Sequence, residues 1–141
     1  MRNRRSARRG ASIIEFSFVV LLLMTVILAS IEFDRMILVY TSVADSARAG
    51  MRYAIVHGST RTTTGDPPSG PLDYTHVVTV VNNFASAGTI DTSSLSVTAS
   101  YPSGNKPGSR VTVSVTYPYN PFVLLPLQVN LTSSSDGIIV F

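Results

Sequence analysis

Glu15 is the side chain whose type and position most clearly ask for a chemical explanation. It is the only charged residue between Arg9 and Glu32, inside an apolar run long enough to enter a bilayer. An acid in lipid costs roughly 3 kcal/mol at the bilayer centre and less near its surface, so such residues usually have a partner. Two interpretations follow. Either the carboxylate reaches the headgroups from a boundary position, or it pairs with a positive charge of a neighbouring subunit and sets the register of an assembly.

Other residues are not spaced for catalysis or for metal binding. His57 and His76 have no cysteine or acid around them at the spacing of metal ligands. The chain contains no cysteine, which excludes disulfides and thiol chemistry. It also lacks a nucleophile elbow, a phosphate-binding glycine loop and a zinc-binding pair of histidines on a helix. We therefore expect neither an enzyme nor a bound metal or other cofactor.

The positive charge of the chain is concentrated at its start. Five of the eleven Lys and Arg residues lie in residues 1–10; without them, six basic residues face eight acidic ones and the formal charge changes from +3 to −2. A nucleic-acid partner is therefore excluded, because the remaining chain has no basic excess. Hydrophobic residues make up 45% of the 141 residues and charged residues 13%. This composition is typical of one lipid-exposed segment attached to one small domain.

The apolar run predicts one membrane-spanning helix at residues 11–31. Such a helix is about 31 Å long, close to the hydrocarbon thickness of about 30 Å. The arginines of residues 1–10 predict an N-terminus in the cytoplasm and a C-terminus on the other side of the membrane. A buried core helix fits less well because residues 18–23 offer no polar face. A cleavable secretory signal is disfavoured by Ile27 and Leu28, which are large where a signal peptidase needs small residues.

The helix is expected to continue outside the membrane through residues 32–57. No glycine or proline occurs in residues 11–49, and Gly58 is a natural stop, so we predict one helix from about Ser12 to Val56.

Two features mark the extramembrane part of this helix. Glu32 and Arg35 are spaced to form an ion pair where the helix leaves the lipid. An apolar stripe with four-three alternation then predicts a packing face for a globular domain or a sister helix. This stripe comprises Phe33, Ile37, Tyr40, Ala44, Ala47, Met51 and Ala54.

Residues 58–141 are expected to form a small α+β head. Val77, Val81 and their apolar neighbours recur at helical spacing and predict a short helix, capped by Asp73 and ended by Gly88. Alternating apolar and hydroxyl residues then predict an antiparallel sheet of three to four strands. The expected strands are 95–101 and 111–117, joined as a hairpin, followed by one or two more at 127–132 and 138–141, with 118–126 crossing between strands.

Three stretches of the chain point to one family. They are Arg9-Gly-Ala-Ser-Ile-Ile-Glu-Phe16, Ala44-Asp-Ser-Ala-Arg-Ala-Gly-Met-Arg-Tyr53, and Val111-Thr-Val-Ser-Val-Thr-Tyr117 with the prolines that follow it. Together they resemble the TadE-like family, the pseudopilin or minor-pilin proteins of bacterial tight-adherence (Flp) pilus systems. The first stretch also resembles the processing site of type IV prepilins, in which a peptidase cuts after a glycine and the fifth mature residue is glutamate.

This resemblance implies that a prepilin peptidase is a partner and cuts between Gly10 and Ala11, which makes residues 1–10 a leader. The free amine of mature Ala11 would then be the charge partner of Glu15 in a neighbouring pilin or pseudopilin subunit. It further implies a single-pass protein of the bacterial inner membrane whose head is periplasmic or is carried into an extracellular pilus. The implied role is structural, in pilus assembly and so in adhesion and biofilm formation.

Two departures from the major Flp pilins refine that expectation. Those pilins have tyrosine after the glutamate and are far shorter, whereas this chain has Phe16 and a long head. It is therefore expected to be a minor pilin or pseudopilin and not the main fibre subunit. The alternative from another class is a signal-anchored exported binding or adhesion protein in which Glu15 is incidental.

Overall fold

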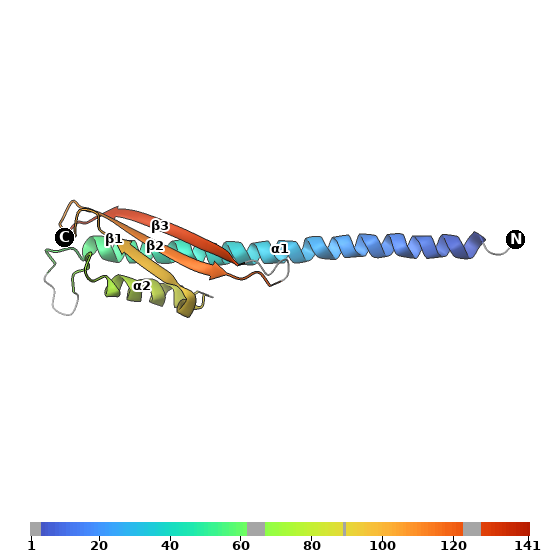
Figure 1. Cartoon of the computed structure of the whole chain (residues 1–141), viewed down its shortest axis with the longest axis horizontal. Helices are drawn as coiled ribbons and strands as arrows, with labels where there is room; N and C mark the ends of the chain where they lie inside the picture. Colours follow the sequence, from blue (N-terminus) through green and yellow to red (C-terminus); the bar gives the residue numbers. More distant parts are fainter. Residues whose placement is uncertain (1–3, 62–66, 89, 123–127) are drawn as a thin grey trace.

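The computed structural model describes residues 4–61, 67–88, 90–122 and 128–141, with side chains from Gly10 onward. In chain order the elements are α1 (Arg4–Val56), α2 (Thr75–Ser86), the short helix η1 (Thr92–Ser94), β1 (Ser96–Ser100), β2 (Arg110–Tyr119) and β3 (Val129–Ile138). Figure 1 shows α1 as a long rod whose N-terminal part stands free, while its C-terminal part carries the rest of the protein. The predicted α+β fold, a long helix with a small head, is confirmed.

α1 runs without interruption from Arg4 to Val56. We predicted a start near Ser12; the helix begins eight residues earlier because the arginine-rich segment consists largely of good helix formers and contains no proline. It ends at Val56, as predicted. Gly58 follows at a place where a Cβ atom would meet the carbonyl oxygen of Phe141 and the side chain of Ile139.

The sheet has three antiparallel strands in the order β1-β2-β3, so β2 is central. Its register places Val113 of β2 between Ala99 of β1 and Ser135 of β3. β3 corrects the predicted pair of strands at 127–132 and 138–141: it is one continuous strand, Val129–Ile138. Ser133 to Ser135 lack apolar alternation, and they are held in the sheet by backbone pairing with β2.

The end of β2 also differs from the prediction. The strand includes Pro118 and continues to Tyr119, whereas the crossing segment was expected to begin at residue 118. A proline is tolerated there because β1 pairs with β2 only as far as Thr116, which leaves one side of β2 without a neighbouring strand. Residues 123–127 of the predicted crossing lie outside the described residues.

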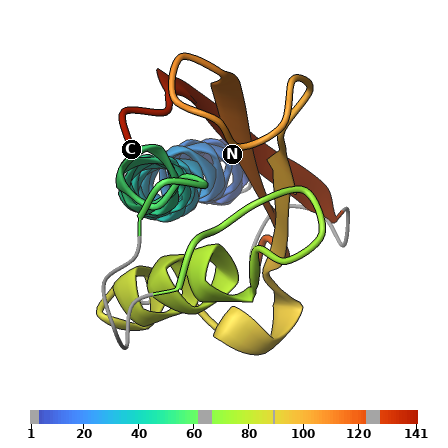
Figure 2. The same ribbon diagram turned by 90° about the vertical axis from the view of Figure 1, so that its left-hand side faces the viewer.

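The core of the head forms where α1 meets α2 and the sheet. Figure 2 shows the three packed around one another, with α1 against both α2 and the sheet. The core is built mainly from valine and alanine: Val39, Val43, Ala47 and Ala54 of α1, Val77, Val81 and Ala85 of α2, and Val111, Val113 and Val115 of β2.

The head covers a stripe of α1 next to the predicted one. Phe33, Ile37 and Tyr40 are 58%, 43% and 47% exposed, whereas Ala47 is fully buried and Ala44 and Met51 are half-buried. As a face for the head, the prediction is therefore wrong at Phe33, Ile37 and Tyr40. The covered positions include Ala47 and Ala54 of the predicted stripe, together with Glu32, Met36, Val39, Val43 and Gly50. As a face for a sister helix, the predicted stripe stays a prediction.

Small residues allow the head to pack closely on the part of α1 around Gly50. A Cβ atom at Gly50 would collide with Val81 of α2 and lie 3.3 Å from Val113 of β2, so both elements approach the helix backbone there. A Cβ atom at Gly137 of β3 would lie 2.6 Å from Ile55 and 2.7 Å from Met51. The close approach of two layers thus requires small residues on α1 and on β3.

Candidate functional site on the N-terminal helix

The bare half of α1, residues 10–31, is a candidate single-pass membrane anchor. The helix is long and apolar enough to cross a membrane, and none of its most apolar stretch is buried by the head. Large side chains stand outward on it, with Phe16 69% exposed and Leu21 67% exposed. A surface of this kind is stable only in lipid or against other apolar surfaces.

Hydroxyl groups in the bare half bond back to their own helix. Ser17 donates to the carbonyl of Ile13 at 2.8 Å, and Thr25 donates to the carbonyl of Leu21 at 2.8 Å. Ser30 does the same to the carbonyl of Val26 at 2.9 Å. These bonds satisfy polar hydrogens that lipid cannot, so these hydroxyl groups do not oppose insertion.

The predicted processing site lies at the open end of this helix. Gly10 and Ala11 are exposed, and apart from its neighbours and the backbone of its own helix, a Cβ atom at Gly10 would meet no described atom within 4 Å. Glu15 is also exposed, four residues after Ala11, which puts the two on one helix face about one turn apart. Among the described side chains, none forms an ion pair with Glu15. Its exposed carboxylate can be approached from outside the chain.

At the other end of the bare half, a polar contact joins α1 to the sheet. The Tyr119 hydroxyl at the end of β2 donates a hydrogen bond to the Glu32 carboxylate, and both residues are buried. The exposed Arg35 side chain approaches the same carboxylate at 3.8 Å, and its guanidinium lies 5.8 Å from the centre of the Tyr119 ring. The predicted Glu32–Arg35 pair is thus confirmed. We call Glu32, Arg35 and Tyr119 the junction.

Sequence reasoning missed Tyr119 as a junction residue. It lies 87 residues from Glu32 and falls in the segment 118–126, which was expected to cross between strands. Burial raises the pKa of the Tyr119 phenol, and the hydrogen bond and negative charge of Glu32 raise it further, while Arg35 acts in the opposite direction. The phenol therefore stays protonated at neutral pH and keeps its role as donor.

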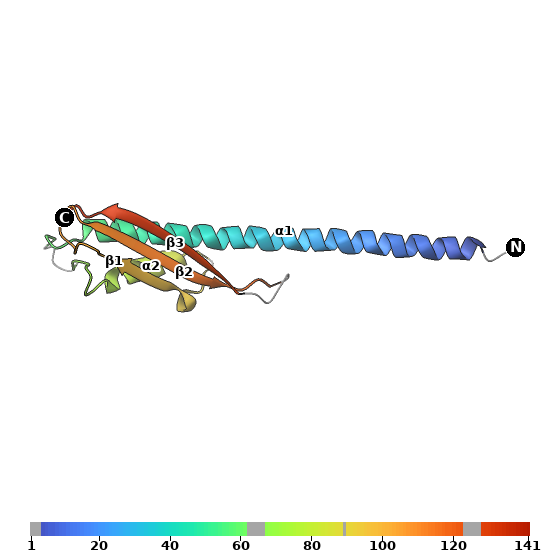
Figure 3. The ribbon, with the colours of Figure 1, turned by 45° about the horizontal axis from the view of Figure 1, so that its top comes forward.

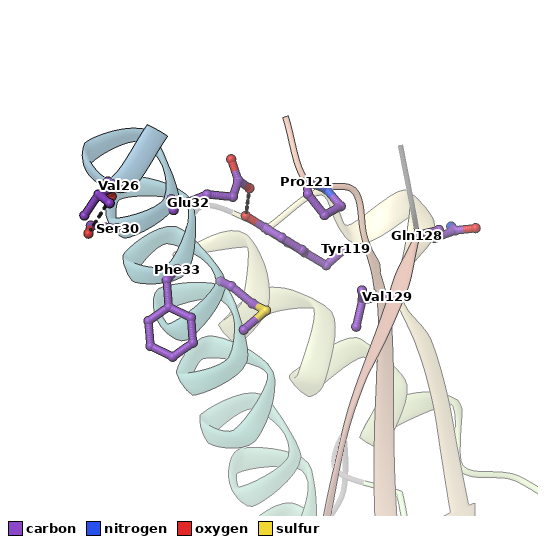
Figure 4. A pocket seen from close by; sticks show the side chains of 10 residues that line it. Val26, Ser30, Glu32, Phe33, Tyr119, Pro121, Gln128 and Val129 are labelled. Carbon is purple, nitrogen blue, oxygen red and sulfur yellow. Dashed lines mark hydrogen bonds between the residues drawn. The ribbon is translucent and has the colours of Figure 1, made fainter. Parts of the chain in front are cut away.

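A groove opens beside the junction, between α1 and the ends of β2 and β3 (Figure 4). Its volume is about 800 Å³, and its lining is mainly apolar. On α1 the lining residues run from Val26 to Met36; on the head they are Tyr119, Pro121, Gln128 and Val129. No group of three or more His, Cys, Asp or Glu side chains suited to a metal ion occurs in the described part of the chain.

Residues 10–52 match the model of the TadE-like protein family. By this match the chain contains a TadE-like segment. This segment begins at Gly10, and the match supports a general association of the protein with a Tad pilus. No curated protein and no solved structure matches the chain.

The TadE-like segment covers the bare half of α1 and most of its covered half. Gly10, Glu15, Glu32 and Arg35 all lie inside it, as does Gly50, where the head approaches the helix backbone. Tyr119, α2 and the sheet lie outside it. The junction thus links the TadE-like segment to a part of the chain that the family model does not describe.

Proposed function

We propose that this TadE-like protein is a structural, non-enzymatic minor pilin or pseudopilin of a Tad-type pilus. It is made as a precursor that a prepilin peptidase cuts between Gly10 and Ala11. The observation that carries this proposal is the open position of Gly10: the family match begins there, on a helix that the head leaves bare. A peptidase can approach the scissile bond at Gly10 without displacing any described part of the head.

Processing gives Glu15 its function. Cleavage creates an amine at Ala11, one turn from Glu15 on the same helix face. The Ala11 amine of one subunit and the Glu15 carboxylate of its neighbour neutralise one another. This pairing removes two charges from an apolar environment and sets the stagger between the two helices. The absence of an ion pair to Glu15 among the described side chains supports a partner in another subunit.

The proposed location is the bacterial inner membrane, with the N-terminus cytoplasmic and the head periplasmic or incorporated into an extracellular pilus that serves adhesion and biofilm formation. The arginines before the span support this orientation. Because the chain has no cysteine, single cysteines at the exposed Ser59 and Ser103 can report it. We expect an impermeant maleimide to label both in intact spheroplasts, and labelling only after lysis would contradict the orientation.

The mature N-terminus tests the processing step. Intact mass is measured for the wild type and for Gly10→Leu, each with and without a co-expressed prepilin peptidase. We expect the wild type to lose residues 1–10 and Gly10→Leu to insert but stay uncut, because a bulky side chain blocks the scissile bond. Ser17→Leu, which adds bulk elsewhere on the exposed helix, is the control and is expected to be cut.

Two outcomes contradict the processing proposal. Normal cleavage of Gly10→Leu would remove the role of Gly10. An uncut wild type, or a cut near residue 30, would favour the alternative of a signal-anchored binding or adhesion protein outside any pilus.

Glu15 variants test the assembly step. Glu15→Leu removes the charge and Glu15→Gln keeps the size, so together they separate charge pairing from packing. We expect both to insert and be cut like the wild type, while their recovery with other pilus components in pull-downs and sheared fibres falls about 10-fold, as for the loss of about 1.4 kcal/mol of pairing. If both variants assemble like the wild type, Glu15 is a boundary residue and the register proposal is wrong.

A further inference from the structure

The end of the head nearest the bare half of α1 carries an unusual surface. It consists of the described residues that follow β2 and begin β3, Asn120–Phe122 and Gln128–Val129, which we call the tip. Phe122 is 88% exposed and Val129 is 42% exposed, although both are apolar. The sequence from Val111 to Ser135 contains no charged residue. An uncharged surface with outward aromatic and aliphatic groups is suited to an apolar environment.

The tip lies beside residues that belong to the predicted membrane span. Pro121 and Gln128 line the same groove as Val26 and Ala29 of α1 (Figure 4). Val26 precedes Glu32 by six residues, or about 9 Å along the helix. The hydrogen bond from Tyr119 to Glu32 fixes the start of the tip at the level where the span ends. The tip therefore reaches the depth of the membrane surface when α1 is in the bilayer.

We propose that the tip is a second membrane contact, resting in the interface of the bilayer that α1 enters. Phe122 and Val129 lie between the headgroups and the upper acyl chains, and the 55%-exposed Arg35 side chain faces the lipid phosphates. The inference rests on α1 being the membrane anchor, but not on peptidase processing or on assembly. Its consequence is mechanical: a head held by α1, the junction and the tip cannot turn freely on a single helix.

Lipid suits this surface better than a second copy of the chain. The apolar surface of the tip is continuous with the span through the groove walls at Val26 and Ala29, so any bilayer that covers the span also reaches the tip. At the same level of α1, Ile31 is 56% exposed and Phe33 is 58% exposed. Lipid covers all these groups at once without a matching protein surface.

Tryptophan fluorescence tests the contact, because the chain contains no tryptophan. Phe122→Trp and Val129→Trp report the tip. Leu22→Trp, 65% exposed in the bare half, is the positive control. Phe141→Trp is the negative control, since Phe141 lies by Gly58 at the opposite end of the head, where Figure 3 shows the C-terminus. All four positions are exposed, so each tolerates the larger ring.

Each full-length variant is reconstituted at low protein density in vesicles of phosphatidylethanolamine and phosphatidylglycerol, with or without lipids brominated on their acyl chains. We expect blue-shifted emission and bromine quenching for the two tip variants. Bromines near the headgroup should quench the tip most, and bromines near the terminal methyl should quench Leu22→Trp most. Phe141→Trp should emit as in water and remain unquenched.

Three results would overturn the inference. If Leu22→Trp is quenched and both tip variants emit like Phe141→Trp, the anchor stands and the tip contact is wrong. If Leu22→Trp is itself unquenched, α1 is not in the bilayer and the inference falls with the anchor. Blue-shifted tip emission without bromine quenching would show that protein, not lipid, covers the tip.

Discussion

The two halves of α1 belong to one helix but differ in the side chains that they carry and in what packs against them. The bare half carries large side chains outward, such as Phe18, which is 74% exposed. On the face toward the head, the covered half carries Ala47, Gly50 and Ala54, because α2 and β2 approach its backbone closely. Both halves are apolar by sequence. Lipid accepts bulky side chains at any angle around a helix, whereas a packed head selects small ones along a single stripe.

The halves also differ in how they satisfy polar groups. In the bare half Thr25 bonds to the carbonyl of Leu21, within its own helix. At the start of the covered half, the Glu32 carboxylate instead accepts a hydrogen bond from the hydroxyl of Tyr119, which lies at the end of β2 and is distant in sequence. These hydroxyl groups of the bare half thus form their hydrogen bonds without the head, while the covered half is bonded to it through Glu32. The change occurs at Glu32, one residue after the predicted end of the span.

The largest expected effect is on the stability of the head, when a glycine of each half of α1 is replaced by leucine. We expect Gly50→Leu to destabilise the head by about 3 kcal/mol or more, at the upper end for overpacking, because the new side chain must push Val81 and Val113 away. Gly10→Leu adds the same side chain where no described part of the head lies within 4 Å, and it should leave the stability of the head unchanged. Urea unfolding of the full chain in detergent, followed by tyrosine near-ultraviolet circular dichroism, gives both values. Equal stability of the two variants would refute the packing argument.

A smaller effect is expected at the junction. Tyr119→Phe leaves the buried Glu32 carboxylate without its hydroxyl donor and should cost about 1–3 kcal/mol. Glu32→Leu should cost a similar amount, and the double variant should cost less than the sum, because both changes remove one interaction. Tyr117→Phe, at a half-buried tyrosine of the same strand, is the control and should change stability little. Additive effects in the double variant would show that the hydrogen bond does not couple α1 to the sheet.

The comparison of halves also shows what the sequence could predict. The continuous helix and its end at Val56 follow from composition and breakers, which act locally. The covered stripe does not, because Ile37, Leu38, Val39 and Tyr40 are all apolar and offer two adjacent faces of similar hydrophobicity. Only the approach of α2 and β2 to the helix backbone chooses between them.

Elements fixed by distant partners were the hardest to predict. β3 continues through Ser133 and Ser135 because it pairs along the whole of β2, and those serines carry no strand signal of their own. The role of Tyr119 depends on the sheet register that places the end of β2 beside Glu32. By contrast, the roles predicted for Gly10 and Glu15 depend on short spacing and not on the fold, and they stay predictions.

The smallest expected effect is a pH dependence of stability to which the junction contributes and the bare half does not. The pKa of Tyr119 is raised, first by burial and then by Glu32, so folding favours the protonated phenol. Its contribution to stability is complete below about pH 10, where unfolded tyrosine is also protonated, and is lost as the pH rises through the folded pKa. We expect the urea midpoint of the wild type to fall above about pH 10 and that of Tyr119→Phe to fall less.

Burial also raises the pKa of Tyr101, so the stability of the variant keeps a residual dependence on pH. The bare half contains no tyrosine and contributes none. If Tyr119→Phe loses stability as steeply as the wild type while its other tyrosines titrate normally by absorbance, the phenol is not held neutral by the junction.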